Sequence, residues 1–131
     1  MSRINGITLS VVAVGLAVYQ PLGLAGDLPD VINALPIRGL GLAAGMVGRV
    51  LVAALCAAAG LALFNRRPIA PPLARAAVVL SGAADLMRYS THIFPSNRPP
   101  GSAPIFVATS VALHGATLTY LLLSKAVRDL S

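Results

Sequence analysis

Four apolar stretches alternate with short polar segments along the chain. Their bounds are about 7–24, 39–64, 73–91 and 105–123. Each is close to the roughly 20 residues that a helix needs to cross the hydrocarbon core of a bilayer. Because that layer holds no water, a spanning backbone must close its own hydrogen bonds, and a helix does so within one segment. The pattern predicts an all-α, integral membrane four-helix bundle, a single transmembrane domain over residues 1–131.

The segments between the stretches are rich in turn-forming residues. Gln20 and Pro21 are expected to bend or end the first helix, which places Tyr19 in the aromatic belt at the membrane surface. Residues 65–72 form a basic, proline-rich turn, and residues 95–102 combine proline, glycine, serine and asparagine. Connections this short predict antiparallel neighbours, the second helix with the third and the third with the fourth.

Composition supports lipid as the solvent around these segments. Charged residues make up 11% of the 131 residues, apolar residues make up 56%, and glutamate is absent. Soluble domains carry about a quarter charged residues, so this chain is poor in material for a water-facing surface. The excess of alanine and arginine over lysine favours a bacterial source. We therefore expect a multi-pass protein of the bacterial inner membrane whose surroundings are membrane lipid.

Positive charges are divided unequally between the two expected sides of the membrane. The net charge is +6, but lysine and arginine lie singly or in pairs at the ends of apolar stretches, unlike the clustered face that binds nucleic-acid phosphates. Nucleic acid is therefore not an expected partner. One side carries Arg38 and Arg98. The other side carries six such residues: Arg3, Arg66, Arg67, Arg75, Lys125 and Arg128. Because cytoplasmic loops are enriched in lysine and arginine, both termini are predicted to be cytoplasmic.

Polar residues in the third stretch share one helix face. Ser81, Asp85, Arg88 and His92 are spaced by 4, 3 and 4 residues. A charge inside the bilayer is costly and normally faces a partner or a water-filled cavity. We expect Asp85 to pair with Arg88. Arg49, in the second stretch, is expected either to reach the membrane surface or to pair with Asp85.

The fourth stretch carries a matching set of polar residues. Ser110, His114 and Thr117 are spaced by 4 and 3 residues, and Ser110 is expected at the depth of Asp85 if the two helices are antiparallel neighbours. Three interpretations of this polar seam remain open. It holds the bundle together by interhelical hydrogen bonds, it forms a path or site for a proton, a small solute, a quinone or a lipid headgroup, or it contacts a partner subunit.

Small residues in the second stretch predict close helix packing. Gly41 and Gly45, and likewise Ala44 and Gly48, are four residues apart, which lets two backbones approach closely in lipid. Contact within the chain and contact between copies of the chain both remain open.

The sequence predicts no catalytic residues, metal site or cofactor. His92 and His114 are the only histidines, and on the expected helices they differ in depth by roughly 15 Å, which opposes a haem held by both. We expect a small non-catalytic membrane subunit that packs against a larger complex or against itself as a homo-oligomer. Alternatives are a small transporter or channel that uses the polar seam, and a quinone- or haem-associated subunit of an electron-transfer complex.

Overall fold

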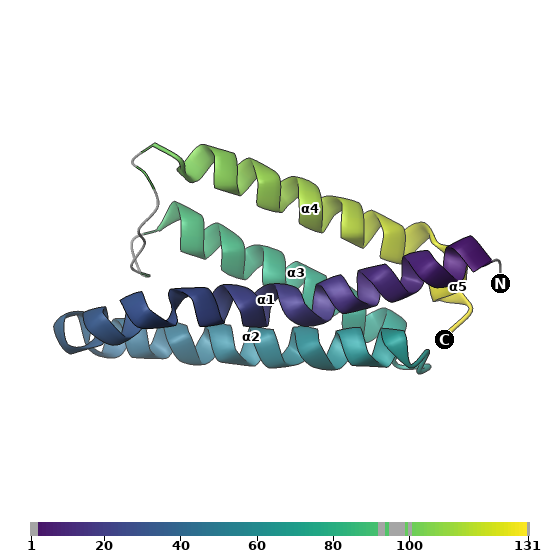
Figure 1. Cartoon of the computed structure of the whole chain (residues 1–131), viewed down its shortest axis with the longest axis horizontal. Coiled ribbons are helices and arrows are strands. Elements are labelled where there is room, and N and C mark those ends of the chain that lie inside the picture. Colours follow the sequence, from purple (N-terminus) through teal and green to yellow (C-terminus); the bar gives the residue numbers. More distant parts are fainter. Residues whose placement is uncertain (1–2, 92–93, 95–98, 100, 131) are drawn as a thin grey trace.

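A computed structural model describes the chain except for residues 1–2, 92–93, 95–98, 100 and 131. All secondary structure in the described residues is helical, as predicted. The helices are α1 (Arg3–Arg38), α2 (Leu40–Phe64), α3 (Ala70–Ser90), α4 (Ala103–Leu123) and the short α5 (Lys125–Arg128). Figure 1 shows α1 and α2 lying side by side, with α3 and α4 as a second pair above them. The beginning of α1 and the whole of α5 lie at the same end of the molecule.

Three helices in the described part of the chain are long and apolar enough to cross a membrane: α1, α2 and α4. Helix α3 has the same length as α4, 21 residues, but its composition is more polar. Its polar residues face the bundle, since Ser81 and Asp85 are buried. The chain is thus a helical membrane protein by composition and length.

The first helix is longer than expected. It continues to Arg38, so the prediction that it ends near Leu24 is wrong. The helix passes through Pro21, Pro29 and Pro36, each of which removes one backbone hydrogen bond. Packing of α1 along α2 supplies the support that lets membrane helices tolerate proline.

The remaining helix bounds lie within three residues of the expected ones. A tight turn at Gly39 separates α1 from α2, and its positive φ of 64° is a conformation that glycine adopts without a side-chain clash. Helix α3 has proline in its first turn, where the missing N–H is not needed. The basic turn between α2 and α3 therefore lies where it was predicted, whereas most of the segment at 95–102 lies outside the described residues.

Two apolar cores occupy different parts of the bundle. The larger core joins α1, α2, α3, α4 and α5 and includes Leu9, Cys56, Ala77 and Leu121. The smaller core consists of Val31, Leu42 and Phe94, together with partly buried neighbours. Along the chain, the buried polar residues of helices α1 to α4 lie between residues of the larger core and residues of the smaller core.

Candidate functional site

Asp85 is the centre of a buried hydrogen-bond network. Its side chain is 1% exposed and accepts three hydrogen bonds. Tyr19 Oη donates to Oδ2 at 2.6 Å, Gln20 Nε2 donates to Oδ1 at 3.0 Å, and Ser110 Oγ donates to Oδ2 at 2.8 Å. Because an ionised carboxylate can only accept, these neutral donors from α1 and α4 hold a buried charge on α3.

The same network joins the polar faces of α3 and α4. Ser81 Oγ lies 2.7 Å from His114 Nε2, and Gln20 Nε2 donates to Ser81 Oγ at 2.8 Å. His114 Nδ1 lies 2.8 Å from the carbonyl oxygen of Ser110. Thr117 makes none of these contacts, and its hydroxyl donates to the Leu113 carbonyl of its own helix at 2.8 Å. The structure therefore brings together Ser81, Asp85, Ser110 and His114, whereas Thr117 lies beside the network.

A second polar cluster consists of one carboxylate and two guanidinium groups. Asp27 Oδ2 lies 3.0 Å from Arg49 Nη1 and 2.7 Å from Arg88 Nη2. Arg88 therefore reaches Asp27 on α1, where we had expected Asp85 on its own helix. Arg49 is 4% exposed, its ion-pair partner is Asp27 where Asp85 was one of the expected alternatives, and its guanidinium lies 5.2 Å from the centre of the Phe94 ring.

Charges balance across the two clusters. Asp27 and Asp85 carry two negative charges, and Arg49 and Arg88 carry two positive charges. Desolvation of charged groups costs several kcal/mol for each ion, and pairing with good geometry offsets that cost. The clusters thus place four charged groups inside the bundle without a net charge.

Of the small residues of α2 for which contact within the chain or between copies was left open, three are not packed closely within the chain. Gly41, Ala44 and Gly48 are exposed, Gly45 is half-buried, and a Cβ atom at Gly41 or Gly48 would meet nothing within 4 Å. The close approach lies at Gly60, where a Cβ atom would come within 2.5 Å of Ala17 Cβ and 2.6 Å of the Ala13 carbonyl oxygen. Gly60 was overlooked because alanines surround it, and its partner on α1 is distant in sequence.

No group of three or more metal-ligating residues occurs in the described residues. His92, the outermost member of the polar set on the third helix, lies outside them. The other histidine, His114, has both ring nitrogens within hydrogen-bond distance of protein atoms.

An apolar groove lies beside the Asp85 network, between α1, α3 and α4. Its volume is about 510 Å³. Along α1 it is lined by a strip of apolar residues that includes Val11, Gly15, Val18 and Leu22. Its polar lining consists of four side chains, Tyr19, Ser81, His114 and Thr117. The groove therefore combines a long apolar wall with a small group of polar atoms.

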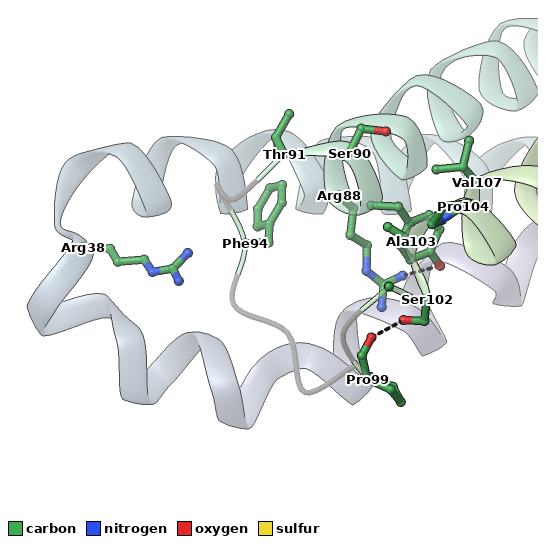
Figure 2. Close-up of a pocket in the computed structure, with 12 residues that line it drawn as sticks. Arg38, Arg88, Ser90, Thr91, Phe94, Pro99, Ser102, Ala103, Pro104 and Val107 are labelled. Atoms are coloured by element: carbon green, nitrogen blue, oxygen red, sulfur yellow. Dashed lines mark hydrogen bonds between the residues drawn. The ribbon is translucent and has the colours of Figure 1, made fainter.

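A second pocket lies at the end of the bundle where α1 meets α2. It has a volume of about 560 Å³, and Figure 2 shows Arg38 and Arg88 extending into it from different helices, with Phe94 between them. Ser102 Oγ donates to the Pro99 carbonyl oxygen at 2.7 Å in the same region. Arg88 is shared between this pocket and the charged cluster and already pairs with Asp27, so the groove is the better candidate for a ligand site.

Sequence reasoning missed the contribution of α1 to both clusters. Tyr19 and Gln20 were assigned to the end of a helix at the membrane surface, and Asp27 to a loop. The available signal was a polar pair inside an otherwise apolar run, which normally indicates a polar partner in the bundle. Tyr19 lies near the middle of α1, and its ring also contacts the His114 ring edge-on, with 5.4 Å between the centroids.

No protein-family model matches the chain, and no curated protein or solved structure is significantly similar to it.

Proposed function

We propose that this chain is a non-catalytic, multi-pass membrane protein that binds an amphipathic small molecule from the lipid phase in the groove between α1, α3 and α4. The observation that carries the proposal is the groove itself, about 510 Å³ of mostly apolar lining with four polar side chains. Small-molecule sites typically have a volume of about 300–1,000 Å³ and show this combination of apolar wall and few polar groups.

The depth of the groove favours a specific ligand over ordinary lipid. Its polar residues come from the middle of three helices: Tyr19 on α1, Ser81 on α3 and His114 on α4. In a spanning bundle these positions lie near the bilayer centre, where lipid tails offer no hydrogen-bonding group. A molecule with an apolar body and a small polar head, such as the ring of a quinone or of its reduced quinol form, is of the class that this lining accommodates. This proposal develops the alternative of a quinone-associated membrane subunit, and it involves no haem.

The observations that favour a partner subunit, or a transporter or channel, are less specific than the groove. The exposed small residues of α2 would fit a partner subunit, but membrane helices present such faces to lipid as well. The charges of the polar seam balance inside the bundle, with Asp85 held by three neutral donors, and this arrangement fits a fixed structural element better than a transport path.

We propose further that α3 is the fourth spanning helix and that both termini face the cytoplasm of a bacterial cell. The six-to-two distribution of lysine and arginine supports this topology. A single cysteine introduced by Asn97→Cys should react with a membrane-impermeant maleimide added from outside the cell. Buried Cys56 should stay unreacted in the unsubstituted protein. Reaction of Asn97→Cys only after the membrane is opened would reverse the topology.

Ligand binding in the groove is tested by photo-crosslinking in nanodiscs. A long-chain alcohol that carries a diazirine should label groove residues of α1, α3 and α4, and the labelling should saturate. Gly15 lines the groove, and a Cβ atom there would meet nothing within 4 Å, so Gly15→Leu fills the space without a backbone clash. We expect it to reduce groove labelling about tenfold, equivalent to about 1.4 kcal/mol of binding free energy.

Gly48→Leu is the matched control for this experiment. It adds the same side chain to α2, where a Cβ atom also meets nothing within 4 Å, and Gly48 does not line the groove. Its labelling should equal that of the unsubstituted protein. Labelling spread evenly over the exposed faces of all helices, and unchanged by Gly15→Leu, would refute the proposed site.

A further inference from the structure

We infer that the groove selects molecules that carry a hydroxyl group, such as long-chain alcohols, phenols and quinols, over ketones, ethers and carboxylates of the same shape. The inference rests on the proposed function and adds the chemical class of the ligand. Its basis is that the polar side chains lining the groove direct their hydrogen atoms to other protein groups. A ligand then finds acceptors and must bring the donor.

Tyr19 is the first of these side chains. Its hydroxyl lies 2.6 Å from Asp85 Oδ2, and because an ionised carboxylate only accepts, the hydrogen belongs to Tyr19. The phenol oxygen keeps its lone pairs. Tyr19 is half-buried and lines the groove, and we assign its oxygen to the ligand as an acceptor.

The tautomer of His114 follows from the contacts of its two ring nitrogens, which include Ser110 Oγ at 3.1 Å from Nδ1, a hydroxyl that donates its hydrogen to Asp85. Nδ1 lies 2.8 Å from the Ser110 carbonyl oxygen, which only accepts, so in the neutral imidazole the hydrogen is on Nδ1. Nε2 is then an acceptor, and the Ser81 hydroxyl, 2.7 Å away, donates to it. Gln20 Nε2 in turn donates to Ser81 Oγ at 2.8 Å. The hydrogens of both groove residues are therefore directed to protein atoms.

Thr117 completes the set. Its hydroxyl donates to the Leu113 carbonyl oxygen of the preceding helical turn at 2.8 Å. Because Thr117 also lines the groove, we assign its oxygen to the ligand as the second acceptor.

This arrangement determines which polar group can be buried in the groove. A ketone, ether or carboxylate oxygen would face lone pairs and lose its hydrogen bonds to water without replacement, which is unfavourable for a buried polar group. A hydroxyl group would donate to Tyr19 or Thr117. For redox-active quinones, the groove would thus favour the reduced, hydroxyl-bearing form.

The test is competition against the photo-crosslinking alcohol by two molecules that differ in one hydrogen-bond donor. We expect 4-octylphenol to displace the probe at about tenfold lower concentration than its methyl ether, 4-octylanisole, as one buried hydrogen bond would give. Equal competition by the two would overturn the inference while leaving the groove as a binding site. Absence of competition by either, with labelling spread over all helices, would remove the proposed function itself.

Substitution of the two acceptor residues tests whether the groove is the source of the preference for the phenol over its ether. The double variant Tyr19→Phe/Thr117→Val removes both oxygens, and we expect the preference for the phenol over the ether to fall close to unity. Thr119→Val is the control, because its hydroxyl also donates to a carbonyl of its own helix, at Gly115, but Thr119 does not line the groove. A preference that persists in the double variant would overturn the assignment, and the competition in the unsubstituted protein stands whether or not that variant folds.

Discussion

Replacing Asp27 by asparagine should lower the free energy of unfolding by about 3–5 kcal/mol, the range seen when one partner of a buried ion pair is removed. The Asp27 carboxylate is shared by Arg49 Nη1 at 3.0 Å and Arg88 Nη2 at 2.7 Å. An asparagine side chain fills the same space but is uncharged, so the two positive groups would repel each other within the bundle. Thermal and denaturant unfolding in the same detergent would measure the loss.

The matched control for Asp27→Asn is Asp129→Asn. Asp129 is exposed near the end of the chain, and its replacement should change the unfolding free energy by less than about 0.5 kcal/mol. Removing one of the positive charges as well, with Asp27→Asn/Arg49→Gln, should recover part of the stability. Equal losses for Asp27→Asn and Asp129→Asn would show that the cluster does not stabilise the bundle.

Gly60→Ala should be the second most damaging change, with an expected loss of about 1–3 kcal/mol from overpacking. The added Cβ atom would lie 2.6 Å from the Ala13 carbonyl oxygen and 2.7 Å from the Ala17 backbone nitrogen. Because these are backbone atoms of α1, no side-chain rotation relieves the clash, and α1 must move away from α2. Unfolding in detergent would report the loss.

Gly48→Ala serves as the comparison, since it makes the same chemical change on the same helix where nothing lies within 4 Å. Alanine favours helix by up to about 1 kcal/mol over glycine, so this variant should be unchanged or slightly more stable. Similar destabilisation by Gly60→Ala and Gly48→Ala would contradict the assignment of the close α1–α2 contact to Gly60.

The helical spacing of polar residues in the sequence was sufficient to predict the part of the site that lies on α3 and α4. Ser81 and Asp85, like Ser110 and His114, repeat at helical spacing, and residues on one helix face must meet whatever packs against that face. The bounds of these two helices were also accessible, because prolines flank them. The expectation that Ser110 lies at the depth of Asp85 therefore came from pattern and neighbour order alone, and the two side chains are hydrogen-bonded.

The contribution of α1 could not be obtained in the same way. Local reasoning gave Pro21 the role of a helix end, whereas the packing of α1 on α2 carries the helix through it. That error placed Asp27 in a loop and left Arg49 and Arg88 without their partner. Which carboxylate meets which guanidinium depends on how three helices pack, and spacing within one helix does not contain this information.

The balance of two carboxylates and two guanidinium groups has an electrical consequence. Moving one elementary charge across the membrane potential is worth about 2.3 kcal/mol per 100 mV. Asp27, Asp85, Arg49 and Arg88 together sum to zero, so a joint displacement of these four side chains would carry almost no gating charge. In a spanning bundle, the two buried clusters would therefore add almost nothing to the response of the protein to the voltage across the bilayer.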